Sequence, residues 1–341
     1  MRTTDELGVG VVGVGTMGEL HARVYSELPG VRLIGVADTD LEKAKTIAHK
    51  YKCKYFHPPE TLFENPDIKA VSIATPDHLH YDLVIAALNA GKHVLVEKPL
   101  TIDVSEAEKI VEVAEVMERI VMVNYNNRWG LPYQKAKSEI AAGKIGAPLF
   151  CYARKVNNIN VPTKLLRWAA KTSCVDFLAT HDIDMMLWFF DYPKVEEVYA
   201  VSCKKILPQK GIPTPDMVVA VVKLVNGAFA VFECGWIYPP TLPMSTDAYM
   251  QIVGEKGVIR IDRHVENVII YSDAGVEYPR VCLGGEVNRQ YQGSFRWALE
   301  RFVSCIKEGK QPEPSARQAL QVVKITSAIH QSIKEGRPIK L

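Results

Sequence analysis

The first 125 positions alternate between two spacings of apolar residues. Continuous apolar runs predict buried strands at 9–14, 31–37, 54–56, 70–74, 93–96 and 120–123. Between these runs, apolar residues three and four positions apart predict helices at 17–28, 40–52, 81–90 and 103–118. Strands that alternate with helices are typical of a parallel sheet with helices on both faces. The pattern therefore predicts an α/β first domain, residues 1–125, with a Rossmann doubly wound parallel sheet.

A second pattern begins after residue 125. Helices are predicted at 131–142, 295–307 and 315–335, and strands at 150–156, 196–203, 217–225, 228–236, 248–253 and 257–262. Asn226-Gly227 and Lys256-Gly257 are hairpin signals. We expect a C-terminal α+β domain, residues 126–341, built on an open, largely antiparallel sheet. One face of such a sheet is free to pack on another copy, which predicts a homodimer or homotetramer through this sheet.

The composition narrows the function classes only a little. With 341 residues, a net charge of +2 and 48% apolar residues, it is that of an ordinary globular protein. The near-neutral charge and the absence of a basic cluster argue against a nucleic-acid partner. No segment resembles a signal or membrane span, so we expect a cytoplasmic protein without a membrane partner. The seven scattered cysteines predict reduced thiols and neither a disulfide framework nor a zinc ribbon.

Three glycines follow the first predicted strand with the spacing Gly13-x-Gly15-x-x-Gly18. Gly13 allows a tight turn, Gly15 has no Cβ to block a pyrophosphate, and Gly18 allows the next helix to pack closely. The phosphates of a dinucleotide would then meet the free N–H groups at the helix N-terminus. The motif alone also fits an ordinary crowded turn, so its context between a strand and a helix carries the interpretation.

Asp38 lies at the end of the second predicted strand, about 20 positions after the last glycine. A carboxylate at this point can accept hydrogen bonds from the adenosine ribose hydroxyls. It would also repel a 2′-phosphate, which favours NAD over NADP. The alternative is that Asp38 caps the helix predicted at 40–52.

The loop 75–80 follows the strand at 70–74, at the end of the sheet where ligands of this fold bind. We expect it to face the nicotinamide half of the cofactor, with Pro76 holding it extended. His78 and His80 could suggest a metal, but the further ligands of a closed site are missing. Helix capping or packing on the cofactor is the favoured interpretation, and no metal is expected.

Lys98 ends the next predicted strand and precedes Pro99. Beside a bound cofactor, burial would lower the pKa of this lysine and let it exchange a proton with a substrate hydroxyl. The alternative is a surface lysine paired with Glu97.

Four stretches together resemble the Gfo/Idh/MocA family of NAD(P)-dependent sugar and cyclitol dehydrogenases, across nearly the whole chain. They are Gly13-x-Gly15-x-x-Gly18, Ala74-Thr75-Pro76-Asp77-His78-x-His80, Gly91-Lys92-His93-Val94-x-Val96-Glu97-Lys98-Pro99 and His181-Asp182-Ile183-Asp184. The resemblance implies that Lys98 is the catalytic lysine and that the bond before Pro99 is cis. It also implies that His181 helps to remove a hydroxyl proton while hydride leaves the same carbon for the nicotinamide.

This chain departs from the family pattern at one position. Many inositol dehydrogenase-like members have an aspartate four residues before the histidine that corresponds to His181, where this chain has Phe177. Asp176 lies one residue away from that position. Either a local bulge brings Asp176 into the site, or Lys98 and His181 move the proton without it. The variation also resembles a branch that includes nucleotide-sugar dehydrogenases, so the family's substrates do not carry over directly.

The motifs and the resemblance together define the expected site. The expected catalytic residues are Lys98, His181 and Asp176. The expected cofactor-binding residues are Gly13, Gly15, Thr16, Met17, Gly18, Asp38, Ala74, Thr75, Pro76, His80, Glu97, Lys98 and Asn124. Expected substrate-binding residues are Lys98, Arg128, Asn158, Arg167, Trp168 and His181, with Asn157 as a further candidate. For Asn124 and Arg128, hydrogen bonds that fix the turn between the domains are an equally good explanation.

The expected function is NAD-dependent oxidation of a secondary hydroxyl on a sugar, cyclitol or nucleotide sugar, with that small molecule as the partner. One alternative is a glycosidase of the same fold that retains NAD and oxidises its substrate only transiently. Another is a non-catalytic sugar or NAD sensor. Because both Lys98 and His181 are present, the sensor is the weaker alternative.

Overall fold

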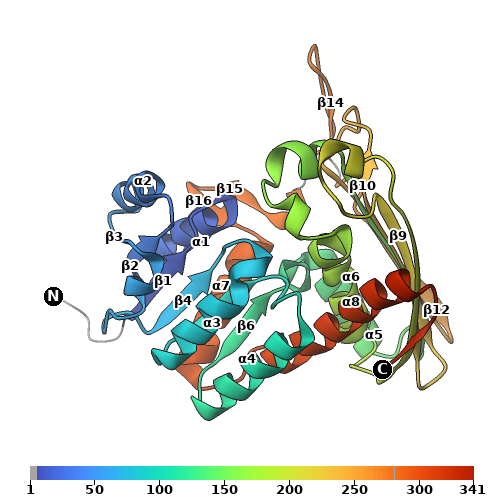
Figure 1. The fold of residues 1–341 in the computed structure, drawn as a ribbon, viewed down its shortest axis with the longest axis horizontal. Helices are drawn as coiled ribbons and strands as arrows, with labels where there is room; N and C mark the ends of the chain where they lie inside the picture. Colours follow the sequence, from blue (N-terminus) through green and yellow to red (C-terminus); the bar gives the residue numbers. More distant parts are fainter. Residues whose placement is uncertain (1–5, 267, 280) are drawn as a thin grey trace. The chain divides into compact units, whose positions relative to one another are not determined.

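The computed structural model describes residues 6–266, 268–279 and 281–341. The chain forms two compact units, and each is made of two separate segments. The first unit contains Met1–Asn126 and Gly284–Leu320, and the second contains Asn127–Leu283 and Gln321–Leu341. Figure 1 shows the two segments of the first unit in blue to cyan and in orange to red.

The first unit is built on a six-stranded sheet with the order β3-β2-β1-β4-β5-β6. All neighbouring strands are parallel: β1 (Leu7–Val12), β2 (Val31–Ala37), β3 (Lys54–Phe56), β4 (Ala70–Ile73), β5 (His93–Glu97) and β6 (Val121–Asn124). The connecting helices are α1 (Thr16–Glu27), α2 (Leu41–Tyr51), α3 (His80–Asn89) and α4 (Val104–Val116). This is the predicted Rossmann sheet. Its strand order changes direction between β1 and β4, where ligands of such sheets bind.

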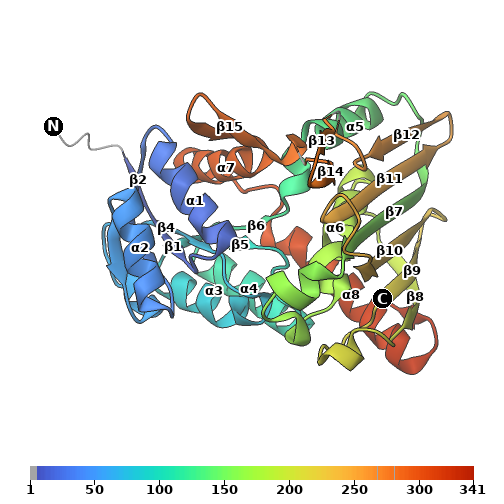
Figure 2. The ribbon, with the colours of Figure 1, turned by 90° about the horizontal axis from the view of Figure 1, so that it is seen from above.

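Helices lie on both faces of this sheet. α7 (Ser294–Glu308) returns from the far end of the chain and packs with α1, whereas α3 and α4 pack together on the opposite face (Figure 2). The strands between them are almost fully buried, as in β4 and β6. Continuous apolar strands of this kind are expected when both faces of a parallel sheet are covered.

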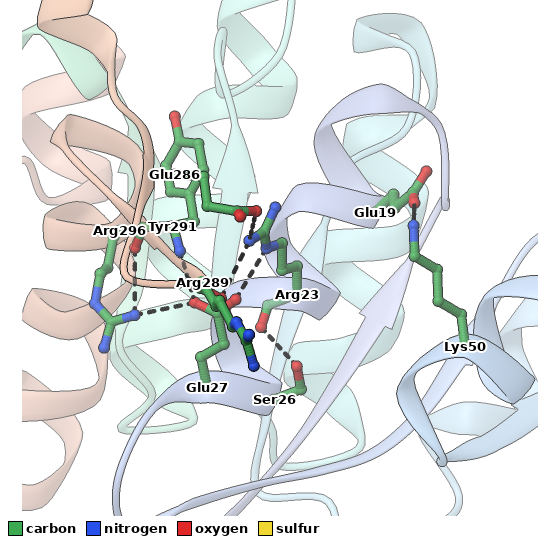
Figure 3. Close-up of polar contacts among 9 residues, drawn as sticks. All are labelled: Glu19, Arg23, Ser26, Glu27, Lys50, Glu286, Arg289, Tyr291 and Arg296. Atoms are coloured by element: carbon green, nitrogen blue, oxygen red, sulfur yellow. Dashed lines mark hydrogen bonds and ion pairs between the residues drawn. The ribbon is translucent and has the colours of Figure 1, made fainter.

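A short hairpin joins α7 to α1 through charged groups. β15 (Gly285–Val287) and β16 (Gln290–Gln292) lie beside α1, where Arg23 contacts Glu27 at 2.9 Å and Glu286 at 2.7 Å (Figure 3). Glu27 also accepts a hydrogen bond from the Tyr291 N–H at 2.9 Å and pairs with Arg296 of α7 at 3.2 Å. The sequence predicts only a connection for this segment. These contacts fix it to the helix that follows the glycine turn.

The second unit is built on a seven-stranded sheet with the order β12-β11-β7-β10-β9-β8-β17. The strands are β7 (Pro148–Asn158), β8 (Val195–Cys203), β9 (Met217–Leu224), β10 (Phe229–Tyr238), β11 (Thr246–Gly254), β12 (Gly257–Asp262) and β17 (Ile339–Lys340). Only the β7–β10 pair is parallel among these strands, so the sheet is largely antiparallel, as predicted. A separate two-stranded hairpin consists of β13 (Ile270–Ser272) and β14 (Gly275–Glu277).

One face of this sheet carries the helices of the second unit. α6 (Thr180–Phe189) and the π-helix η6 (Val175–Ala179) lie against β7 and β10, and α5 (Leu131–Ala141) contacts β12. The second half of α8 (Ala316–Glu335) joins β8, because the Ser332 hydroxyl accepts the Ala200 N–H at 2.9 Å. Within the residues described, no helix has the length and apolar character that a membrane crossing requires.

Candidate functional site

The glycine turn between β1 and α1 has the geometry that its spacing predicts. Gly13 has a φ of +81°, a conformation that residues with a Cβ rarely adopt. A Cβ on Gly13 would also lie 2.8 Å from the Ala74 carbonyl oxygen and from Thr75 Cγ2. A Cβ on Gly18 would lie only 1.7 Å from the Gly13 carbonyl oxygen. Glycine is therefore required at both positions, and the turn lies against the loop that follows β4.

Gly15 has a different environment, since an added Cβ would meet only Lys43 Nζ, at 4.0 Å. The backbone here borders open space. α1 begins at the next residue, Thr16, and no side chain caps its first N–H groups. Free N–H groups and open space at a helix N-terminus are what a pyrophosphate requires. These residues therefore fit a dinucleotide.

Asp38 is tied to the glycine turn and is not the cap of α2. Its Oδ2 accepts the Val14 N–H at 2.8 Å, and its Oδ1 accepts the Asp40 N–H at 3.0 Å. Asp40 caps α2 instead, by accepting the Lys43 N–H. Lys43 Nζ also lies 3.9 Å from Asp38 Oδ2. The carboxylate is thus fixed where a ribose next to the pyrophosphate would lie.

His80 joins the loops that follow β4 and β5. Its Nδ1 lies 2.8 Å from the Pro99 carbonyl oxygen, and its Nε2 lies 3.0 Å from the Thr75 carbonyl oxygen. The side chain is buried, and burial lowers the pKa of His80 although both carbonyl groups act in the opposite direction. The bond between Lys98 and Pro99 is cis, as expected. His80 therefore fixes the segment that carries the half-buried Lys98.

Glu97 forms a buried polar cluster with His21 and Asn124. Glu97 Oε1 accepts a hydrogen bond from Asn124 Nδ2 at 2.6 Å and lies 3.1 Å from His21 Nε2. Burial alone would raise the pKa of Glu97, but His21, Asn124 and Lys98 together lower it. The carboxylate is therefore ionised directly before the expected catalytic lysine. His21, which is not among the residues expected from the sequence, lies on α1 less than one turn after Gly18.

Arg128 is held by residues of its own unit. It is 1% exposed, and its guanidinium donates to Asp184 at 2.8 Å from Nε and at 2.6 Å from Nη2. It also contacts the Tyr192 hydroxyl and lies over the Trp188 ring. This arrangement is the one expected if Arg128 fixes the turn after β6, and its role in substrate binding remains a prediction.

The two aspartates that follow His181 orient α6. Asp184 pairs with Arg128, as described above, and Asp182 accepts from Lys155 of β7 at 2.5 Å. Burial raises the pKa of Asp182 although Lys155 and Arg263 oppose the shift. His181 itself is the second residue of α6 and is half-buried. The motif thus places two buried ion pairs beside one half-buried imidazole.

The element before α6 contains the bulge that one of our two sequence interpretations required. η6 is a π-helix, and the Thr180 N–H donates to the Val175 carbonyl oxygen five residues earlier. A π-turn contains one residue more than an α-turn. Asp176, five residues before His181, therefore lies one turn from it. This geometry supports a role for Asp176 in the site, and the role itself remains a prediction.

The other predicted substrate residues lie at the end of β7 and on the segment between β7 and η6. Asn158 is 8% exposed and donates to the Met244 carbonyl oxygen at 3.2 Å. Its neighbour Asn157 donates to the Thr246 hydroxyl at 2.6 Å. Arg167 is exposed and Trp168 is half-buried. These two remain open to a ligand, whereas the two asparagines mainly hold β7 to β11.

No metal centre is found in the described part of the chain, where no three His, Cys, Asp or Glu residues could together hold an ion. The cysteine side chains that are described, at 53, 151, 174, 203, 234 and 305, are free thiols.

Family models match both parts of this chain. A model described as the oxidoreductase family's NAD-binding Rossmann fold matches residues 7–125. A model described as the same family's C-terminal alpha/beta domain matches residues 137–341. Together they cover most of the chain and match its two kinds of sheet.

Several proteins of similar length are similar in sequence to this chain. Inositol 2-dehydrogenase 4 of Saccharopolyspora erythraea is 32% identical over 319 residues, covering 89% of this chain and 86% of that protein. Inositol 2-dehydrogenase of Rubrobacter xylanophilus is 27% identical over 341 residues, covering 99% and 94%. A solved structure has the same fold as this chain: scyllo-inositol dehydrogenase from Lactobacillus casei, crystallised with NAD(H) and scyllo-inositol. Its TM-score is 0.84 at 21% sequence identity, and the match covers 98% of this chain and 99% of that chain. The chain therefore belongs to the Gfo/Idh/MocA family of oxidoreductases, with that family's NAD-binding Rossmann fold and C-terminal α/β domain.

Proposed function

We propose that this protein is an NAD-dependent dehydrogenase that oxidises a secondary hydroxyl of a cyclitol or sugar. The observation that carries the proposal is the placement of Lys98 directly after an ionised, buried Glu97 in a unit whose glycine turn fits a dinucleotide. The relatives named as inositol dehydrogenases support a cyclitol as the first substrate class to test.

When bound, NAD accepts the hydride of the reacting carbon. The N–H groups at the start of α1 bind the pyrophosphate, and Asp38 binds the adenosine ribose. Lys98 and His181 exchange the proton of the substrate hydroxyl, because an amine and an imidazole can each hold or release a proton near neutral pH. Arg167 and Trp168, which remain open to a ligand, contribute to substrate binding.

The proposal is tested by following nicotinamide absorbance with the cofactor-stripped protein. The panel contains inositol isomers, free sugars and nucleotide sugars, each with NAD and with NADP. We expect NAD reduction with one of these classes, the inositols first. No reduction with any of them, from a protein that binds NAD, would contradict the proposal.

Asp38 sets the choice between NAD and NADP. Its carboxylate lies 2.8 Å from the Val14 N–H of the glycine turn, where it would repel a 2′-phosphate. We expect a preference for NAD of at least about tenfold in kcat/KM, which corresponds to roughly 1.4 kcal/mol. Asp38→Asn keeps an oxygen acceptor but removes the charge, and should reduce the preference by improving the use of NADP. Asp40→Asn, a matched change at the cap of α2, should leave it unaltered; equal preferences in all three proteins would refute the role of Asp38.

We also propose that the chain forms a homodimer or homotetramer through the open face of the second sheet. Val201 of β8 and Val219 of β9 are opposite each other and are 51% and 38% exposed. On the neighbouring strands, Phe229 is 42% exposed and its ring lies 4.8 Å from that of Phe150. Exposed apolar side chains on one face of a sheet are typical of an interface, and a second copy offers a surface of the same kind.

Light scattering coupled to gel filtration tests the association. We expect the mass of two or four chains for the wild type and the mass of one chain for Val219→Glu, because the change buries a charge in the interface. Val116→Glu, at a 76% exposed position of α4, is the matched control and should not alter the mass. A wild-type protein with the mass of one chain at micromolar concentration would refute this association.

A further inference from the structure

The carboxylate of Asp176 is held by a histidine from the C-terminal helix. His330 Nε2 of α8 lies 2.8 Å from Asp176 Oδ2, although the residues are 154 positions apart. The Ser173 hydroxyl donates to the same oxygen at 2.7 Å. The Asp176 side chain is only 8% exposed, whereas that of His330 is 38% exposed. The contact thus joins the buried carboxylate of Asp176 to the partly solvent-exposed imidazole of His330.

The environment of the pair favours proton exchange at the imidazole. Burial alone would lower the pKa of His330, but the charge of Asp176 and the hydrogen bond between them raise it. On the neighbouring β10, the charges of Asp176 and Asp182 act on the Cys234 thiol and contribute to a raised pKa. Its hydrogen bond with Cys174 and its burial raise the pKa of Cys234 well above the ordinary value, so this thiol does not compete for the proton.

Asp176 is also next to the expected proton acceptor of the second unit. The i to i+5 hydrogen bond from Thr180 to Val175 means that Asp176 and His181 are one turn apart in this element. A chain of titratable groups therefore runs from the start of α6 through Asp176 to a half-exposed histidine on α8. Proton transfer along such a chain suits histidine, because one ring nitrogen can accept a proton while the other releases one.

We infer that His330 is a positioning residue that holds Asp176 and forms the proton exit of the site. The inference rests on the proposed dehydrogenase function. In that oxidation, the C–H hydrogen leaves with both electrons as hydride for NAD, while the O–H bond breaks and the C=O double bond forms. The hydroxyl proton must reach water in every turnover. It passes from His181 to Asp176 and then to Nε2 of His330, and Nδ1 of His330 releases a proton to solvent.

The variant His330→Gln separates this role from a purely structural one. Glutamine can still donate a hydrogen bond to Asp176, but it cannot carry a proton. We expect kcat in dilute buffer near neutral pH to fall by about tenfold or more, with KM values for both substrates unchanged. Added imidazole should restore kcat in a concentration-dependent manner. His49→Gln, on the exposed face of α2, is the matched control and should behave as the wild type.

Wild-type kcat in His330→Gln at every buffer concentration would overturn the inference, as would a loss that imidazole does not restore. A second measurement requires no turnover. We expect NMR titration of the His330 ring to give a midpoint above the ordinary value of a histidine, and Asp176→Asn should lower it. An unchanged midpoint in Asp176→Asn would overturn the inference that Asp176 and His330 act as a pair. If none of the candidate substrates led to NAD reduction by the wild type, the proposed function would fail. That result does not depend on the variants.

Discussion

Replacing Lys98 by alanine is expected to reduce turnover by about a thousandfold or more while NAD binding stays nearly intact. Lys98 follows the ionised Glu97 at the carboxyl end of β5, and no other amine lies on that strand. The groups that fit the cofactor, the glycine turn and Asp38, belong to β1, α1 and β2. Removing one side chain after β5 therefore leaves them in place. Steady-state kinetics measure the first effect, and calorimetric titration with NAD measures the second.

Two further variants make this result specific. Lys98→Met retains the length of the side chain without the amine, so it should be as inactive as the alanine variant. Lys69→Met changes an exposed lysine of the same unit and should keep wild-type turnover. Turnover of Lys98→Ala within tenfold of the wild type would show that another group moves the proton.

Replacing Asp184 by alanine is expected to lower the free energy of unfolding by about 3–5 kcal/mol. The change leaves the Arg128 guanidinium, which is 1% exposed, without the carboxylate that it contacts through two hydrogen bonds. Burial lowers the pKa of Arg128, and Asp184 and Tyr192 oppose this effect. Because a guanidinium is not deprotonated in proteins, the buried charge persists when Asp184 is removed. Urea denaturation of the wild type and the variant measures the difference.

An exposed ion pair provides the matched control. Glu115 and Arg317 have side chains 52% and 70% exposed, so Glu115→Ala should change the free energy of unfolding by only about 0–1 kcal/mol. A similarly small change for Asp184→Ala would refute the structural importance of the buried pair. Because Asp184 is three residues after His181 on α6, the variant should also reduce turnover in the fraction that remains folded.

Local pattern was sufficient for most of the first unit. The apolar runs predict β2 and β3 with the same bounds as the structure, and Gly13, Gly15 and Gly18 each have the environment that their spacing implies. These features depend on neighbours within a few residues of sequence. Local pattern did not distinguish between the two roles of Asp38, because Asp40 two residues later is an equally good cap. The structure excludes the cap role, because Asp38 accepts the N–H of Val14, 24 positions away. Its role in binding the ribose stays a prediction.

Contacts between distant segments could not be derived from the sequence. The hairpin at 285–292 is mostly polar, and its place beside α1 depends on Arg23 and Glu27. Similarly, no local signal relates His330 to Asp176. An additional residue between Asp176 and His181 was visible as a departure from the family pattern. That it forms a π-turn is a property of the folded backbone.

The most direct test of the proposed function is the amount of NADH formed for each molecule of substrate consumed by the stripped enzyme. A dehydrogenase that releases its oxidised product forms one NADH for each substrate molecule, and the product contains a new carbonyl group. We expect this one-to-one ratio. Consumption of a glycoside with release of free sugar and no net NADH would contradict the account, because NAD would then be oxidising the substrate only transiently.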